Sequence, residues 1–227
     1  QAYYWSLLSR EKFLIIWILI FVGMGLYLLG YIKFPHDSKT KKFGLVRMSS
    51  ATVTFAFCIY MFSGLLGNPI PALAGIIPPS KGSGCDWRNV KYCEILELPK
   101  DFRGYFDYQQ AIDHAIIQNK PLFIDFTGHA CFNCRRMEEN VWSHPDVKKI
   151  LNEDYVIVAL YVDSRAPLLG SKSNETLGDR NFKIQFCDFN QAAQPYYVLL
   201  NPKNPTKPLV EPVGYNTDIL NFVEFLN

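Results

Sequence analysis

The feature that most restricts how this chain can fold is a run of twenty uncharged residues near its start. Residues 13–32 read FLIIWILIFVGMGLYLLGYI. About 20 apolar residues in a helix span the ~30 Å hydrocarbon core of a bilayer, where unpaired backbone polar groups are costly. A secretory signal peptide is the rival interpretation, but its apolar core is shorter, roughly 7–15 residues, and ends at a small-residue cleavage site that is not evident here. We therefore expect a transmembrane helix.

A second uncharged stretch covers residues 48–80, and within it residues 50–66 favour a helix. The helix breakers GNPIP at positions 67–71 then end the pattern. A buried helix of a soluble protein is the alternative, but the uncharged length and the nearby first run favour a second membrane helix. We assign residues 1–79 to a membrane segment with spans at about 13–32 and 50–66.

The loop between the two runs is basic. Asp37 is its one acid, against five cations: Lys33, Lys39, Lys41, Lys42 and Arg47. Short positive loops remain in the cytoplasm, so both ends of the membrane segment are expected on the other side. The C-terminal part of the chain then lies where disulfides form and persist.

The chain begins with Gln1 rather than Met, so we expect a fragment or a processed product of a longer protein. Its formal net charge of +2 gives no reason to expect a nucleic acid partner. Residues 80–100 begin SKGSG, which is typical of a flexible linker. The soluble domain is predicted to occupy residues 101–227.

The soluble part has the pattern of an α/β domain. Residues 163–180 are predicted to form a loop. The helix predicted at 131–151 is expected to be interrupted near Pro145, because proline cannot donate a backbone hydrogen bond. The order of elements predicts a mixed central sheet with helices on both faces. Helices are predicted at 108–118, 131–151 and 217–226, and strands at 121–126, 154–162, 196–200 and 208–213.

Two cysteines, Cys131 and Cys134, lie just after the first predicted strand. The spacing C-x-x-C alone is weak, because zinc sites use it too. Here it falls at the start of a helix, whose N-terminus favours a thiolate, the nucleophilic form of cysteine. An exposed first cysteine and a shielded second one, a helical turn further on, are the arrangement that thiol–disulfide exchange needs.

This order of elements around C-x-x-C resembles the thioredoxin fold over about residues 101–227. The resemblance implies that Pro195, in Gln194-Pro195, is the cis-proline that faces the cysteine pair; an ordinary proline at the start of a strand is the alternative. It also implies that Asp125 is a buried carboxylate that trades a proton with Cys134 through water; an Asp at the end of a strand, bonded to nearby backbone, is the alternative. The sequence departs from the family at Ala130, where thioredoxins carry Trp, and at Phe132-Asn133, where they carry Gly-Pro.

The whole layout resembles the C-terminal part of the DsbD family of membrane thiol:disulfide interchange proteins. The run FIDFTGHACFNCRRMEENVWSHPDV looks like that family's motif, with Glu138 as an acid four residues after the second cysteine, near the active site; a solvated carboxylate of the helix is the alternative. The resemblance implies a protein-disulfide reductase of the bacterial inner membrane, with the thioredoxin-like domain in the periplasm. Electrons would come from an upstream transmembrane redox domain and pass to extracytoplasmic disulfide proteins. No cofactor or metal is implied.

Other possibilities stay open from the sequence. The same cysteine pair suits a reductase of apocytochrome c cysteines in cytochrome c maturation. A metal-binding thioredoxin-fold module is the alternative from another class, although zinc needs four ligands and no second C-x-x-C is present. Cys85 and Cys93 flank a short loop and are candidates for a structural disulfide or a second redox pair. Cys58 and Cys187 are expected to be buried free thiols.

Overall fold

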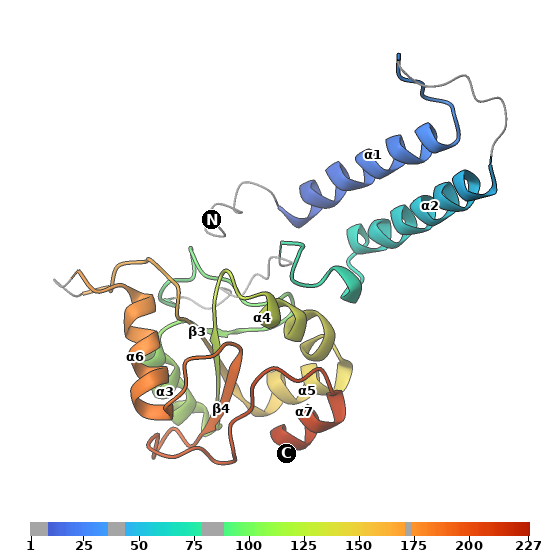
Figure 1. Ribbon diagram of the computed structural model, residues 1–227. Helices are drawn as coiled ribbons and strands as arrows, with labels where there is room; N and C mark the ends of the chain where they lie inside the picture. The colour runs from blue at the N-terminus through green and yellow to red at the C-terminus, as the bar shows by residue number, and fades with distance from the viewer. Residues whose placement is uncertain (1–8, 36–43, 79–88, 171–173) are drawn as a thin grey trace. The chain divides into compact units, whose positions relative to one another are not determined.

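The computed structural model describes residues 9–35, 44–78, 89–170 and 174–227 (Figure 1). The chain divides into two compact units. The first holds the described residues up to Leu73, and the second begins at Ala74. Each unit is described by itself.

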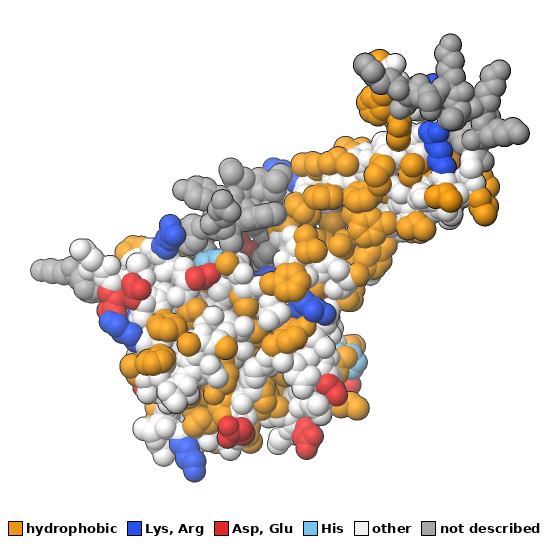
Figure 2. Space-filling model, viewed as in Figure 1, with side chains coloured by type: hydrophobic (Ala, Val, Ile, Leu, Met, Phe, Trp, Pro, Cys, Tyr) orange, Lys and Arg blue, Asp and Glu red, His pale blue; other side chains and the backbone are white. Residues whose placement is uncertain are grey.

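The first unit is a pair of apolar helices. Helix α1 spans Arg10–Leu28 and helix α2 spans Leu45–Leu65; a short 3-10 turn, Pro71–Leu73, comes after them. Both helices are long and apolar enough to cross a membrane by length and composition. Figure 2 shows hydrophobic side chains over much of the visible surface of this unit.

Both helices begin earlier than the sequence predicted. The Ser9 hydroxyl caps α1 by accepting a hydrogen bond from the Lys12 backbone N–H at 3.4 Å, so the charged residues after Ser9 belong to the helix. In α2, Arg47 lies in the first turn, and its guanidinium donates to the carbonyl oxygens of Tyr27 and Leu28 at the end of α1. The last carbonyl groups of a helix have no partner within it. Arg47 supplies one to Leu28 and adds a second donor to Tyr27, whose carbonyl oxygen also accepts from the Gly30 backbone N–H.

The second unit contains a mixed sheet, as predicted, but the first of its four strands was not predicted. Its strands are β1 (Gly104–Tyr105), β2 (Leu122–Thr127), β3 (Val156–Tyr161) and β4 (Tyr196–Leu200), in the order β1-β3-β2-β4. The β1-β3 and β3-β2 pairs are parallel, and β2-β4 is antiparallel. The central strands β2 and β3 are buried along their whole length.

Helices cover both faces of this sheet (Figure 1). Successive side chains of a strand point to opposite faces, so Phe123 packs with Trp142 and Phe222 on one face, and Ile124 packs with Ala111 and Ala115 on the other. The first face carries α4 (Phe132–Met137), a π-helical turn (Glu138–Trp142), α5 (Pro145–Asp154) and α7 (Ile219–Leu226). The second face carries α3 (Tyr108–Gln118) and α6 (Leu177–Phe189).

The structure corrects three sequence predictions. The predicted linker 80–100 is too long, because Leu96 and Leu98 are buried in the core of the domain at 1% and 2% exposure. Helix α6 begins inside the predicted loop 163–180. The predicted strand 208–213 forms only isolated bridges, because its two prolines cannot donate to a ladder.

Candidate functional site

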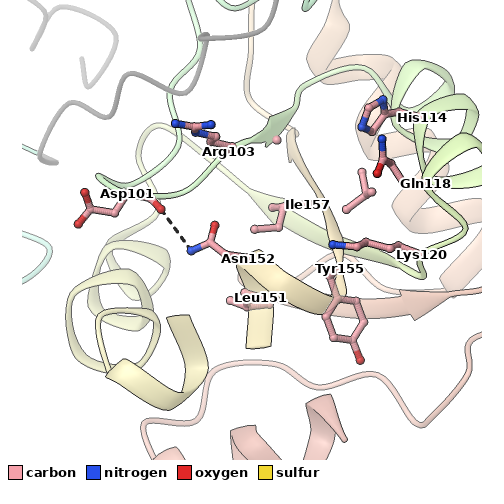
Figure 3. Close-up of a pocket in the computed structure, with 11 residues that line it drawn as sticks. Asp101, Arg103, His114, Gln118, Lys120, Leu151, Asn152, Tyr155 and Ile157 are labelled. Carbon is pink, nitrogen blue, oxygen red and sulfur yellow. Dashed lines mark hydrogen bonds between the residues drawn. The ribbon is translucent and has the colours of Figure 1, made fainter. Parts of the chain in front are cut away.

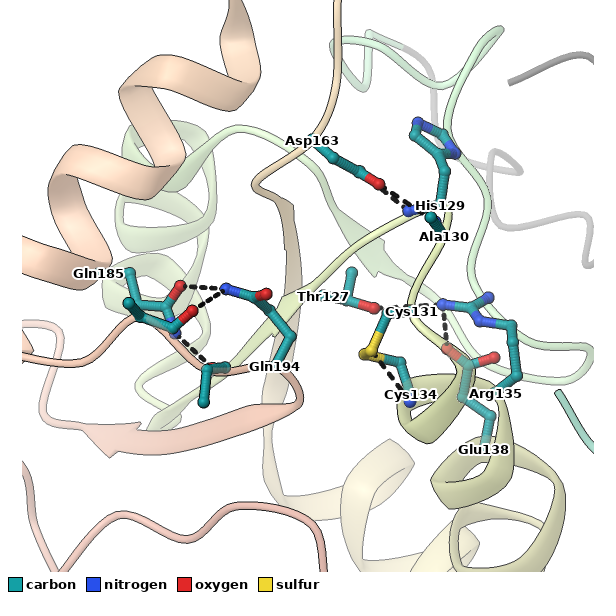
Figure 4. The surroundings of a disulfide bond; sticks show 12 residues. Thr127, His129, Ala130, Cys131, Cys134, Arg135, Glu138, Asp163, Gln185 and Gln194 are labelled. Carbon is teal, nitrogen blue, oxygen red and sulfur yellow. Dashed lines mark hydrogen bonds and ion pairs between the residues drawn. A yellow bond between two sulfur atoms is a disulfide. The ribbon is translucent and has the colours of Figure 1, made fainter. Parts of the chain in front are cut away.

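The two cysteines of the C-x-x-C motif form a disulfide at the start of α4 (Figure 4). Their sulfur atoms are 2.02 Å apart. Cys131 is the N-cap residue of α4, and its sulfur accepts a hydrogen bond from the Cys134 backbone N–H at 3.1 Å. Cys134 is 1% exposed, whereas Cys131 is partly exposed. A partner can therefore approach the first sulfur and not the second.

The loop that leads into Cys131 is held by an acid from the neighbouring strand. Asp163 comes just after β3, and its carboxylate accepts hydrogen bonds from the backbone N–H groups of His129 (2.9 Å) and Ala130 (3.1 Å). A side chain at Gly128 would meet this carboxylate at 3.1 Å. Sequence reasoning missed Asp163, although an acid directly after a buried strand that is parallel to β2 is a usable signal.

The Gln194–Pro195 peptide bond is cis, which is the conformation that the sequence predicted. The loop before it is fixed by α6. The buried Gln185 side chain donates to the Ala193 carbonyl oxygen at 2.7 Å and accepts from the Gln194 side chain at 2.9 Å (Figure 4). Sequence reasoning missed Gln185 because it did not predict α6. The part that Pro195 plays at the site stays a prediction.

Three largely buried ionisable side chains, Asp125, Arg135 and Glu138, form a cluster and interact electrostatically with one another. Asp125 is 2% exposed, and the side chains of Arg135 and Glu138 are 12% and 9% exposed. The Arg135 guanidinium pairs with the Glu138 carboxylate at 2.7 Å and donates to the Thr127 hydroxyl at 3.1 Å. Asp125 and Thr127 lie on the same face of β2, because they are two residues apart in one strand.

Burial dominates the protonation of this cluster. It raises the pKa of Asp125 well above its usual value, and the charge of Glu138 adds to the effect. Burial also raises the pKa of Glu138, to about 7, although the positive charge of Arg135 opposes the rise. One oxygen of Asp125 has no hydrogen-bond partner. The structure therefore places both predicted carboxylates in one buried cluster, and it adds Arg135, which the sequence did not single out.

His129 lies against the core rather than in solvent. Its ring packs on Tyr161 with the ring centres 4.6 Å apart. Burial lowers the pKa of the imidazole, and Asp163 partly offsets this. The environment therefore favours the uncharged form of the ring.

The remaining cysteines divide into three cases. Cys58 is buried in α2, as expected. Cys187 is exposed, which corrects the expectation of burial, because α6 turns this position toward solvent. The predicted Cys85–Cys93 bridge depends on Cys85, which lies outside the described residues. Among the residues that the structure describes, no three metal-ligating side chains gather at one place.

A cavity of about 710 Å³ lies away from the cysteine pair (Figure 3). It is lined by Val156 and Ile157 at the start of β3, whereas Cys131 comes after the end of the parallel strand β2. Polar side chains around it include Arg103, His114 and Lys120. The cavity and the disulfide are therefore at opposite ends of the sheet.

Residues 103–202 match the model of a family described as thioredoxin-like. The sheet order and the bonded C-x-x-C pair define the same class: a thioredoxin-like α/β domain with a redox-type cysteine pair.

Among solved structures, a thioredoxin from Thermus thermophilus is 18% identical, with a TM-score of 0.43; the match covers 54% of this chain and 83% of that one. A DsbH oxidoreductase is 16% identical, with a TM-score of 0.40 and the same two coverages.

Proposed function

We propose that this chain is a membrane-anchored protein-disulfide reductase. Its Cys131–Cys134 pair takes electrons from a transmembrane redox domain and passes them to disulfides of extracytoplasmic partner proteins. The observation that carries the proposal is the unequal exposure of the bonded pair, partly exposed at Cys131 and 1% at Cys134. Exchange requires an accessible thiolate as the attacking group, and the unequal exposure makes Cys131 the sulfur that a partner meets first.

The reaction can be written from this geometry. The thiolate of reduced Cys131 attacks one sulfur of the partner's disulfide, and the partner's other sulfur leaves as a thiolate. Cys134 then gives up its proton and attacks Cys131, which re-forms the Cys131–Cys134 bond and releases the second partner sulfur. Two electrons have moved from the pair to the partner.

Two features support the membrane part of the proposal. Helices α1 and α2 have the length and composition of membrane spans, and the loop between them is basic. A basic loop on the cytoplasmic side puts the chain from Ala74 onward on the other side of the membrane. In a bacterium, this location is the periplasm.

The first test is the reduction potential of the pair in the full chain, solubilised in detergent. Equilibration against glutathione and dithiothreitol, with thiol counting, is compared for the wild type, Cys131→Ala and Cys134→Ala. All three carry Cys187→Ser, because Cys187 is exposed and would add a background thiol. We expect a two-electron couple below about −200 mV that both alanine variants abolish. A pair that stays oxidised under strong reductant, or thiols that titrate only after a chelator is added, refutes the proposal.

The exposed Cys187 also tests the orientation. A maleimide that does not cross membranes is added to spheroplasts that express a variant with Cys131→Ser and Cys134→Ser. If intact spheroplasts of this variant are labelled, and those of the matched variant that also carries Cys187→Ser are not, the domain lies outside the cytoplasm. Labelling of Cys187 only after lysis contradicts the proposed orientation.

A further inference from the structure

Arg135 and Arg136 are neighbours of the same type, but the fold treats them differently. The Arg135 side chain is 12% exposed and contacts Thr127 and Glu138. Arg136 instead lies over the rings of Phe132 and Tyr215, which are 47% and 39% exposed. One arginine therefore belongs to the buried cluster, and the other packs on two exposed aromatic rings.

Glu138 lies one helical turn after Cys134. Its backbone N–H donates to the Cys134 carbonyl oxygen, and side chains four residues apart are neighbours on a helix. Two neighbouring charges affect the pKa of Glu138: Arg135 from α4 lowers it and Glu139 from the π-helical turn raises it. The groups that face Glu138 from the sheet are Asp125 on β2, Tyr161 on β3 and Tyr197 on β4, and the charge of Glu138 raises the pKa of each of them. Arg135 is the one cation among all these groups.

A single cation beside two buried carboxylates opposes the effect of burial on their protonation. If both carboxylates were ionised, the cluster would hold a net negative charge in a low-dielectric interior, which is costly. With one ionised, the cluster is neutral. The 2.7 Å contact identifies Glu138 as the carboxylate that shares the charge of Arg135, while burial and the charge of Glu138 raise the pKa of Asp125 and favour its protonated form.

We propose that Arg135 is a positioning residue of the exchange site: its buried guanidinium keeps the Glu138 carboxylate able to accept the Cys134 proton when Cys134 attacks the mixed disulfide. This inference rests on the proposed function. The proton moves from the Cys134 thiol to Glu138. The Cys134 sulfur bonds to the Cys131 sulfur, the bond from Cys131 to the partner breaks, and the partner leaves as a thiolate that takes a proton from water.

The size of the effect depends on the pKa of Glu138. A base with a pKa of about 7 is about half ionised at pH 7. The positive charge of Arg135 lowers the pKa of Glu138, so removal of Arg135 should raise that pKa. A rise of its pKa by one unit would leave about a tenth ionised, which slows the second attack about fivefold at pH 7.

The test measures both steps of one reaction. The reduced full chain in detergent, with Cys187→Ser, is mixed with dithiobis(nitrobenzoate). The attack by Cys131 releases one coloured thiolate, and the attack by Cys134 releases a second. We expect Arg135→Gln to slow the second release about fivefold at pH 7 and to move its pH midpoint upward by at least about one unit. Arg136→Gln, the matched surface control, leaves the second phase unchanged, and Arg135→Lys restores it in part.

A further pair of variants separates this role from simple damage to the fold. Loss of one partner of a buried ion pair strongly destabilises a protein, so Arg135→Gln is also made together with Glu138→Gln, which leaves no unpaired buried charge. We expect Glu138→Gln to be slow by itself, and the added Arg135→Gln to slow it no further. The inference is overturned if the second release is as fast in Arg135→Gln as in Arg136→Gln. It is also overturned if adding Arg135→Gln slows the second release of the Glu138→Gln variant by the same factor as it slows that of the wild type. Absence of any second release in the wild type would instead refute the proposed function.

Discussion

Replacing Glu138 with glutamine will remove a pH dependence from the stability of the thioredoxin-like domain. The Glu138 side chain is 9% exposed, and burial raises its pKa from an ordinary value of 4.5 to about 7. Between these two pH values the folded state keeps a proton that the unfolded state has lost. Stability rises with pH only where the unfolded state binds more protons, so here the free energy of unfolding must fall as pH rises.

The magnitude comes from the same two pKa values. A tenfold difference in proton affinity corresponds to about 1.36 kcal/mol, so the ionised carboxylate costs the folded domain about 3 kcal/mol above pH 7. The contribution is fully present below pH 4.5 and is lost as pH rises through about 7. Glutamine has no proton to lose in this pH range. The free energy of unfolding of Glu138→Gln should therefore fall by about 3 kcal/mol less than that of the wild type as pH rises. The change also deprives Arg135 of its partner, and for this reason the slope with pH is the readout rather than the absolute stability.

The assay is guanidinium unfolding of residues 74–227, produced alone and oxidised, monitored by circular dichroism from pH 4.5 to 8. Glu153→Gln is the matched control, because Glu153 is an exposed carboxylate of α5. We expect the wild type and the control to lose about 3 kcal/mol more than Glu138→Gln over this range. Parallel curves for the wild type and Glu138→Gln would refute the argument that burial sets the charge of Glu138.

Three further changes test other parts of the domain. Trp142→Ala should lower the free energy of unfolding by about 3–5 kcal/mol in denaturant titrations, because Trp142 is fully buried between Phe102 and Phe123; a loss below about 1 kcal/mol would contradict this packing. Thr176→Ala removes the capping box at the start of α6 and should cost about 1 kcal/mol in the same titration, with Thr176→Ser near the wild type. Asp163→Ala should speed hydrogen exchange of the backbone before Cys131, while Asp163→Asn, which keeps an acceptor, should change it less; equal exchange in the alanine variant and the wild type would show that this contact does not hold the loop.

Some elements were predictable because a local pattern determines them. Helix α3 has the predicted bounds: its apolar side chains recur at helical spacing, the Asp107 side chain caps its start, and Asn119 ends it with a φ of 50°. The central strands were predictable for a similar reason. Strands buried on both faces appear as continuous apolar runs, and the sequence places β2 and β3 within two residues of their observed bounds.

Helix α6 shows why other elements were missed. Its buried face includes Asn181 and Gln185, while Phe182 and Phe186 are 41% and 53% exposed. Asn181 donates to the Tyr161 carbonyl oxygen at 3.0 Å, so the inner face of the helix holds neighbouring backbone by hydrogen bonds. A search for apolar side chains at helical spacing cannot find such a face. The available signal was the capping box at its start, in which the Thr176 hydroxyl accepts from the Asp179 backbone N–H.

The candidate site contains a part that a local pattern determines and a part that depends on the tertiary fold. The cysteine pair is a local motif, so its position was predictable. Its surroundings come from sheet topology: β2 and β3 are parallel and in register, with Thr127 opposite Tyr161, so the residues after both strands meet at one edge. That pairing brings Asp163 to the loop before Cys131, although 32 positions separate the two residues in the sequence.

Arg135 and Arg136 show that the fold also decides which charged side chain lies beside the cysteine pair. Nothing in the sequence distinguishes two adjacent arginines after a cysteine. The turn of α4 directs the first toward Thr127 on β2 and the second toward Tyr215, in the loop before α7. A buried cation beside Glu138 changes the proton affinity of that carboxylate, whereas a surface cation is largely screened by solvent. Burial raises the pKa of Glu138, and the arginine that the fold places beside it opposes this rise.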